Sequence, residues 1–511
     1  MMPVTPLSMS SSPPPGPEKP KYVCWECHLI KKKCSKDLPA CETCVKRGVE
    51  CSYMVNTARL ALSSVFQAVR HAKDIHSLAF TAVMDTYRAP QNVRQGVASY
   101  FKSINPWFPV IDQGDFEGRL ESMFENPTAE ACVLVLCMSA IVADSPDVPK
   151  PKKSPKSKSN GNGNEGLGDN AYHSAKATLT LVQSKLQMTR PLLQAELLIA
   201  MYEFSNAMFQ QAYMSLLRCV QITKVLNWHN GIFWNLDRQP LDAKELKLCS
   251  TLWWSIVHLD CLLHLGHQDH DQPSPMLTAG LSLHLMIPFP EAFDQNLLAR
   301  MPFLAGGQNQ GFWDANMGQF DDMMVPEASS AWSLSTVLQH LANPGSLPPP
   351  DNDFLNCIIN QTQKMLPLRG RPSDHNAALG TNFIALMKLN QTRLLAGIGP
   401  MVGPMVPQSM DYTRAAKAIE SVVKCAGEQA TLIAQNPERL AAGAVAPCWA
   451  ITMYHASLLL VSHGNGGLGY MDWLQRVEQL KSSLDLISKR WKIAGEYSSL
   501  VDRAIRTRLG R

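Results

Sequence analysis

Six cysteines are crowded into one short stretch of the chain in a regular spacing. The spacing is C-x2-C-x6-C-x6-C-x2-C-x6-C, with thiols at Cys24, Cys27, Cys34, Cys41, Cys44 and Cys51. A C-x2-C pair presents two thiolates from one tight turn to the same cation, and Zn²⁺ takes four such ligands at about 2.3 Å. Since two separate tetrahedra need eight ligands, six thiolates serve two Zn²⁺ ions only when two of them bridge both metals. The repeat therefore predicts a binuclear zinc cluster.

The same six cysteines also fit a framework of three disulfide bridges. The other eight of the 14 cysteines are scattered through apolar stretches, and no secretory segment is visible. A chain of 511 residues buries a core without covalent staples. These observations favour zinc over disulfides and indicate a reducing compartment.

Residues 23–53 resemble the DNA-binding domain of the fungal binuclear zinc-cluster transcription factors. The resemblance rests on the six cysteines, the lysine run before Cys34, Pro39 in the connecting loop and the ending Cys51-Ser52-Tyr53. It implies that Cys24 and Cys41 bridge two Zn²⁺ ions. By the same resemblance the remaining thiols divide into two pairs, one for each zinc site: Cys27 with Cys34, and Cys44 with Cys51.

Between Cys27 and Cys34 lies the sequence His28-Leu29-Ile30-Lys31-Lys32-Lys33. In the family this segment is a short helix that meets the major groove of double-stranded DNA, usually at a CGG triplet. Lysine donors suit the N7 and O6 acceptors of guanine, so we expect Lys31 to read a base. We expect Lys32, Lys33 and His28 to hold phosphates, which position the module without reading sequence.

Ile30 departs from the family pattern, because a basic residue usually stands there. Residues 21–53 carry six Lys and one Arg against four acidic residues, a net charge of +3. Two Zn²⁺ ions and six thiolates reduce this to about +1. The weak charge leaves an alternative open, in which the cluster is a structural fold of an interaction protein that restrains a related factor by heterodimerisation.

The composition of the chain indicates how the rest of the protein is divided around this module. Residues 1–20 are rich in Pro and Ser and read as a disordered leader. Overall, 45% hydrophobic and 18% charged residues indicate a globular core. We expect a zinc-cluster domain at residues 21–54, a helical linker at 55–90 and a large all-α domain at 91–511.

Residues 58–87 of the linker have apolar residues on alternating three- and four-residue steps, as in a coiled-coil seam. The seam comprises Leu62, Val65, Val69, Ala72, His76, Ala79 and Val83. In the family a helix at this place often pairs two subunits, which would make a homodimer through 58–87. A helix that docks on its own chain fits the pattern equally, and Ala89-Pro90 ends it in either case.

Residues 92–290 resemble the helical regulatory domain of the same fungal family. The resemblance rests on residues 100–112, where Pro106 and Pro109 exclude a regular helix, and on Trp253-Trp254 followed by Asp260. It implies an all-α domain that controls activation and takes a coactivator or a small-molecule effector. Cys261 stands where the family has an arginine, so we expect the family's buried ion pair at Asp260 to be absent.

Several stretches interrupt the helical pattern. Residues 145–170 hold five lysines between Lys150 and Lys158, and read either as a nuclear-import signal or as a solubilising loop. Residues 300–352 are rich in breakers and are expected to be irregular, with 312–324 either an activation segment or a packed loop. We expect one further helix over Leu440–Ser462. The residues His264, His267 and His270 fit a solvated loop better than a second metal site.

The sequence contains no Gly-rich phosphate loop, no G-x-S-x-G elbow and no H-E-x-x-H helix, so we expect no enzyme. The longest apolar runs, such as Ala131–Met138, are too short to span a bilayer. The predicted protein is a nuclear, sequence-specific regulator of RNA polymerase II genes. Factors of this build often control a metabolic or secondary-metabolite biosynthetic gene cluster, which we expect here.

Overall fold

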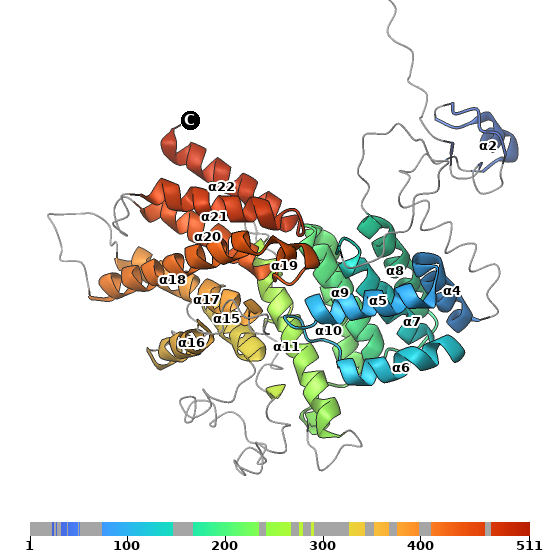
Figure 1. Cartoon of the computed structure of the whole chain (residues 1–511), viewed down its shortest axis with the longest axis horizontal. Helices are drawn as coiled ribbons and strands as arrows, with labels where there is room; N and C mark the ends of the chain where they lie inside the picture. Colours follow the sequence, from blue (N-terminus) through green and yellow to red (C-terminus); the bar gives the residue numbers. More distant parts are fainter. Residues whose placement is uncertain are drawn as a thin grey trace, which may run out of the picture.

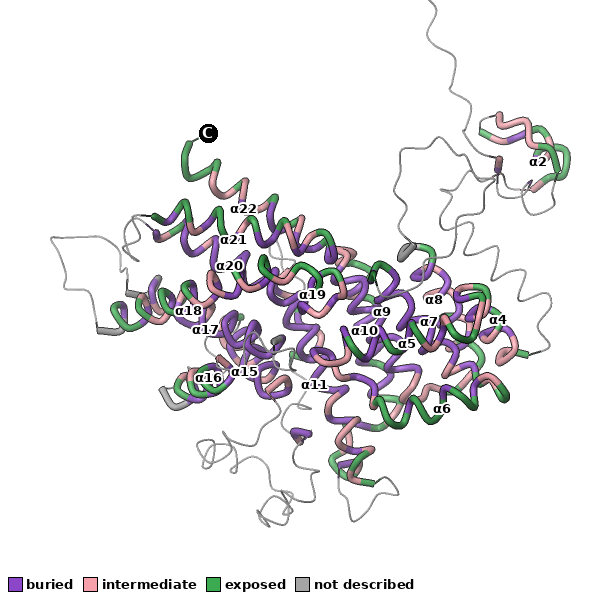
Figure 2. Tube along the Cα trace, in the orientation of Figure 1, coloured by how far each residue is buried: buried purple, intermediate pink, exposed green. Residues whose placement is uncertain are grey.

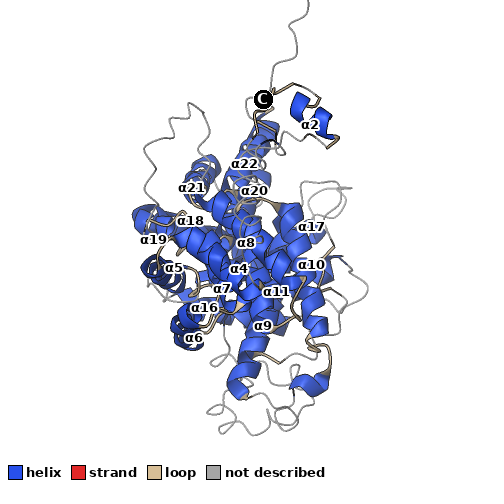
Figure 3. Ribbon diagram, turned by 90° about the vertical axis from the view of Figure 1, so that its right-hand side faces the viewer, coloured by secondary structure: helices blue, strands red, loops and turns tan. Residues whose placement is uncertain are grey.

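The computed structural model describes residues 23–24, 27, 32–37, 39–49, 51, 74–146, 167–234, 242–266, 275–279, 288–290, 326–342, 352–366, 376–397, 410–464 and 472–510. Within these ranges every regular element is a helix and no strand occurs (Figures 1 and 3). A cysteine-bearing module with one short helix precedes a large helical body. This confirms the fold class expected from the sequence.

The helices follow one another as α2 (Glu42–Arg47), α4 (Ile75–Tyr87), α5 (Pro90–Ser103), α6 (Gln113–Glu125), α7 (Ala129–Val142), α8 (Leu167–Gln183), α9 (Arg190–Ser205), α10 (Phe209–Val225), the 3-10 helix η1 (Gly231–Trp234), α11 (Ala243–Gly266), α15 (Pro326–Ala342), α16 (Asn352–Met365), α17 (Asn376–Gly397), α18 (Met410–Gln435), α19 (Pro437–Ala442), α20 (Cys448–His463), α21 (Trp473–Ile487) and α22 (Ile493–Leu509).

Helix α7 is the centre of the first half of the helical body. Twelve of its 14 residues are buried, and α4, α5, α8 and α9 pack around it. A helix that is apolar on almost all sides has to be surrounded in this way. Thr128 begins the helix by accepting the N–H of Ala131 at 3.4 Å.

Helix α4 begins after Asp74, whose backbone is extended and whose side chain caps the helix, so the helix expected over 58–87 does not run continuously through residue 74. Helix α4 packs on α7, α5 and α8. Ala79 and Val83 of the predicted seam are fully buried there, and His76 Nδ1 accepts the N–H of Ala129 at 3.0 Å. This part of the seam therefore docks on its own chain and is unavailable to a second copy. The other seam positions, Leu62 to Ala72, lie outside the described residues.

The packing of α4 also shifts the start of the helical body. Arg88, with φ of 64°, ends α4, and Pro90 is the first residue of α5, so the predicted break at Ala89-Pro90 is present. The helices on its two sides nevertheless share one core. The boundary expected between residues 90 and 91 thus falls in the first turn of α5, inside one helical body.

Helix α11 runs between the helices of the first half and those of the C-terminal part (Figure 1). Trp253 and Trp254 are buried, and so are most other residues of α11 (Figure 2). By length and composition α11 could cross a membrane, but 78% of its apolar window is buried inside the fold, as in a core helix.

Asp260 of α11 holds the next described segment against the helix. Its carboxylate accepts the N–H of Leu277 at 3.1 Å, the N–H of Thr278 at 2.7 Å and the Thr278 hydroxyl at 2.6 Å. Backbone amides and a hydroxyl thus bind the buried carboxylate. The expected absence of an ion pair at Asp260 stays a prediction.

Two expectations for the C-terminal part are wrong. Residues 326–342, expected to be irregular, form α15, where Ser329 and Ser330 donate their hydroxyls to carbonyls three residues earlier and so can be buried. The helix expected over Leu440–Ser462 is two helices, α19 and α20. Gly443, with φ of 87°, ends α19, and Pro447 precedes α20.

Candidate metal centre and nucleic-acid interface

The second C-x2-C pair lies on the first turn of α2. Cys41 is the residue before the helix, and its Sγ accepts the N–H of Cys44 at 3.4 Å, as an N-cap side chain does. Gly48 ends the helix with φ of 64° and donates to the carbonyls of Cys44 and Val45. This short capped helix directs Cys41 and Cys44 to the same side of the module.

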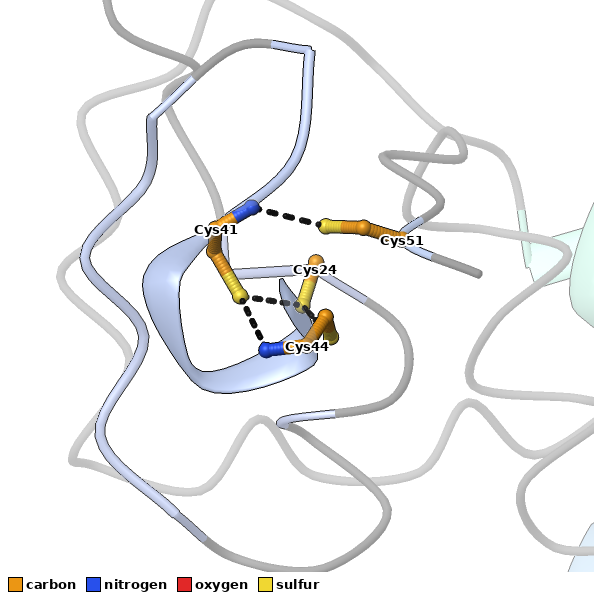
Figure 4. Close-up of side chains that lie close together, drawn as sticks. All are labelled: Cys24, Cys41, Cys44 and Cys51. Atoms are coloured by element: carbon orange, nitrogen blue, oxygen red, sulfur yellow. Dashed lines mark hydrogen bonds between the residues drawn. The ribbon is translucent and has the colours of Figure 1, made fainter. Parts of the chain in front are cut away.

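The six sulfur atoms fall into two groups of four. Cys24, Cys27, Cys34 and Cys41 form one group, and Cys24, Cys41, Cys44 and Cys51 form the other; within each group all Sγ atoms lie within 4.8 Å of one another. Figure 4 shows four of these side chains converging. Cys24 and Cys41 belong to both groups.

The spacing of the sulfur atoms fits zinc and not disulfides. Cys24 Sγ lies 3.5 Å from Cys41 Sγ and 3.5 Å from Cys44 Sγ, and Cys27 Sγ lies 3.5 Å from Cys41 Sγ. A tetrahedron with Zn–S bonds of about 2.3 Å has S···S edges of about 3.8 Å. A disulfide bond of about 2.05 Å is far shorter, and all six thiols are free.

The environment of the thiols opposes the presence of several thiolates without a cation. Burial raises the pKa of Cys24 far above its usual range and raises that of Cys44 to about 12. Burial also acts on Cys41, but the N–H of Cys44 and the neighbouring thiols donate to it and lower its pKa to about 6. Holding six thiolates together therefore requires positive charge among them.

Two of the predicted DNA-contacting residues can be located. Lys32 and Lys33 are exposed, directly before Cys34, and the N–H of Lys32 donates to the carbonyl of Cys27 at 3.0 Å. His28 and Lys31 lie outside the described residues. The located lysines thus stand on the surface next to a cluster thiol, where an approaching phosphate can reach them.

Two polar side chains that the sequence did not single out form bonds across the module. We call residues 24–34 and 41–51 its two lobes; Thr43 lies in the second lobe, and Ser35 directly follows the first. Thr43 Oγ1 donates to the carbonyl of Lys33 at 2.9 Å. Ser35 Oγ accepts the N–H of Glu42 at 2.9 Å. Nothing in their spacing signals this role, because the contacts depend on how the lobes meet.

The helical body offers one described groove that bears on the effector prediction. It lies between α18 and α21 and encloses about 200 Å³, with Lys424, Glu428 and Arg476 among its lining residues. Typical small-molecule sites enclose about 300–1,000 Å³. This groove therefore does not support an effector site, which stays a prediction.

Within the described residues, a module with two four-sulfur groups that share two cysteines precedes a helical body, and this donor set fits a binuclear zinc cluster. Comparison with protein families agrees. Residues 22–60 match the fungal Zn(2)-Cys(6) binuclear cluster domain, and residues 97–269 match the fungal specific transcription factor domain. The chain therefore matches the models of both domains that are typical of a fungal zinc-cluster transcription factor.

Individual relatives are similar over limited regions. The chain is 49% identical over 39 residues to an ergochrome gene cluster transcriptional regulator of Claviceps purpurea, and 44% identical over 55 residues to a monodictyphenone cluster transcription factor of Emericella nidulans. It is 26% identical over 131 residues to transcription factor BOA15 of Botryotinia fuckeliana.

These matches take in 8%, 9% and 26% of this chain and 8%, 13% and 64% of the respective relatives. The chain thus spans less than two thirds of the length of each of these relatives. No solved structure matches the chain.

Proposed function

We propose that this chain is a sequence-specific transcription factor whose cluster binds two Zn²⁺ ions. The observation that carries the proposal is that Cys24 and Cys41 belong to both four-sulfur groups. They would bridge the ions, while Cys27 and Cys34 complete one site and Cys44 and Cys51 the other. Bound Zn²⁺ supplies the positive charge that offsets the thiolates and joins the two lobes.

The lysine arm, residues 31–33, is the proposed DNA-reading element. Lys31 donates to guanine acceptors in the major groove, in a CGG-like triplet. Lys32, Lys33 and His28 bind phosphates. The exposure of Lys32 and Lys33 beside the cluster supports this assignment.

A binding experiment with two matched variants tests the arm. Lys31→Ala in the zinc-loaded chain should weaken binding to a CGG-containing duplex by about 1–3 kcal/mol, roughly 5- to 150-fold, and relax the preference for the triplet. Lys46→Ala removes the same charge from α2, where Lys46 is exposed and pairs with Glu42 at 3.0 Å. It should leave the preference intact. Equal losses in both variants, or none, would contradict the assignment.

We further propose that the protein acts in the nucleus on a metabolic or secondary-metabolite biosynthetic gene cluster. The similarity of the chain to regulators of the ergochrome and monodictyphenone gene clusters supports this target class. Deleting the gene should change the transcripts of a contiguous group of biosynthetic genes together. Changes scattered over unrelated genes would contradict the proposal.

The helical body, from α4 onward, is the proposed regulatory domain for a coactivator or effector. The competing function, restraint of a related factor by heterodimerisation, would need an accessible pairing surface. The burial of Ala79 and Val83 within the chain weighs against pairing through that part of residues 58–87.

A further inference from the structure

Lys33, at the end of the lysine arm, and the nearby Ser35 are hydrogen-bonded to the start of α2 through side chains that belong to no cluster cysteine. Thr43, on α2 between two cluster cysteines, donates its hydroxyl to the carbonyl of Lys33 at 2.9 Å. In the opposite direction, the N–H of Glu42 donates to Ser35 Oγ at 2.9 Å. Residues 33–35 and 42–43 are thus joined twice.

The hydrogen bond from Thr43 fixes the orientation of the Lys33 carbonyl, which the cluster cysteines do not hold. Zinc at Cys34 would fix the Sγ of that residue, and Lys32 is held through its N–H to Cys27 at 3.0 Å. Neither of these two contacts holds the carbonyl of Lys33, which lies in the peptide plane between Lys33 and Cys34. Because the Lys33 carbonyl belongs to that plane, the Thr43 hydroxyl sets its orientation and with it the direction in which the exposed Lys33 side chain leaves the backbone.

We propose that Thr43, supported by Ser35, is a positioning residue for DNA binding. It does not touch DNA, and it holds Lys33 in the direction in which that lysine meets a phosphate. The gain comes from preorganisation, because an arm already fixed loses less freedom when the duplex binds. The inference rests on the proposed function, in which Lys33 is a phosphate contact.

The test uses the full chain, loaded with zinc, and four variants. Thr43→Val keeps the shape and removes the hydroxyl, whereas Thr43→Ser keeps the hydroxyl. Lys33→Ala removes the contact itself, and a double variant combines Thr43→Val with Lys33→Ala. Each is titrated with the preferred duplex over a range of salt concentrations, and its zinc content is measured.

Thr43→Val should weaken binding about 2- to 10-fold, the range for loss of one hydrogen bond. The slope of log affinity against log salt should become less steep by up to about 0.9, the value for one phosphate contact. Thr43→Ser should bind within about two-fold of the natural chain, since it restores the donor. In the Lys33→Ala background, Thr43→Val should have no further effect, because there is no side chain left to direct.

Three results would overturn the inference while leaving the proposed function standing: unchanged affinity of Thr43→Val, additive losses in the double variant, or a loss of zinc that accounts for the weaker binding. Failure of the natural, zinc-loaded chain to bind any duplex is a different result. It would remove the proposed function, and the inference with it.

Discussion

Replacing a shared cysteine should affect the metal centre differently from replacing an unshared one. Cys24 belongs to both four-sulfur groups, whereas Cys27 belongs to one and Cys51 to the other. Cys27→Ala leaves Cys24, Cys41, Cys44 and Cys51 as a complete set. Cys24→Ala leaves three sulfurs in each group and no complete set.

The zinc content should follow this count. The natural chain should hold about two ions, and Cys27→Ala or Cys51→Ala about one that resists a chelator. Structural zinc sites with a full set of ligands bind with about 10–16 kcal/mol of apparent free energy, whereas three-sulfur sites compete poorly. Cys24→Ala should therefore lose both ions at a chelator concentration that leaves one in Cys27→Ala.

Native mass spectrometry of the full chain, after equilibration with a chelator of known affinity, measures the ions retained. Cys41→Ala is the matched replicate for the shared position, and Cys132→Ala is a control because Cys132 lies in α7. Retention of one tightly held ion by Cys24→Ala would refute the shared arrangement. So would identical losses for all six cluster cysteines.

The helical body yields three further predictions. His258 Nε2 lies 2.8 Å from Thr381 Oγ1. The Thr381 hydroxyl donates its own proton to the carbonyl of Ala377 at 2.8 Å, so the neutral imidazole is the donor to Thr381. Burial lowers the pKa of His258 to about 4. This folded-state pKa lies below the unfolded value of about 6.5. The stability that neutral His258 contributes is therefore fully present above pH 6.5 and is lost as the pH falls toward 4. Unfolding in denaturant should show about 2 kcal/mol less stability at pH 5 than at pH 7 from this group, and His258→Gln should remove that part of the pH dependence. Asp260→Ala leaves two backbone N–H groups without their acceptor and should lower the free energy of unfolding by about 3 kcal/mol. Amide exchange at Thr278 should become faster. Unchanged exchange would argue against a role of Asp260 in holding residues 277 and 278. Gly443→Ala should destabilise the protein by about 1–2 kcal/mol, because φ at Gly443 is +87° and the new Cβ would lie 3.2 Å from Ile104 Cδ1. Gly118→Ala, on the exposed face of α6, should stabilise it by about 0.5–1 kcal/mol. A reversed order of the two variants in thermal unfolding would contradict this prediction.

The cysteine module is predictable because its spacing alone limits its chemistry. The spacing of two C-x2-C pairs and two further thiols predicts a binuclear cluster with two shared thiolates. The family resemblance names Cys24 and Cys41 for this role, and these are the two residues that the sulfur groups in the structure share. The fully apolar helix at residues 129–143 is predictable for a similar reason. A segment without a polar face has to lie in the core.

The linker shows where sequence patterns stop being decisive. The seam that includes Ala79 and Val83 fits a second copy of the chain or another face of the same chain, because both offer an apolar surface. Only the arrangement of α7 decides between them for α4.

Two further features depend on local or tertiary contacts that a pattern does not record. Residues 326–342 lie inside the stretch 300–352, whose Gly, Pro, Asn and Asp content predicts irregular structure, yet they form a helix in which Ser329 and Ser330 bond to carbonyls of the same helix. Thr43 gained its partner from the meeting of the two lobes, and no periodicity indicates such a contact.

Site selection on randomised duplex DNA tests the central claim most directly. The full chain would be used in zinc-loaded and metal-stripped forms, with Lys31→Ala as a third sample. The account predicts that CGG-type triplets are enriched with zinc, that the enrichment disappears without it, and that Lys31→Ala weakens it. No enrichment by the zinc-loaded chain, or enrichment that persists without metal, would contradict the account.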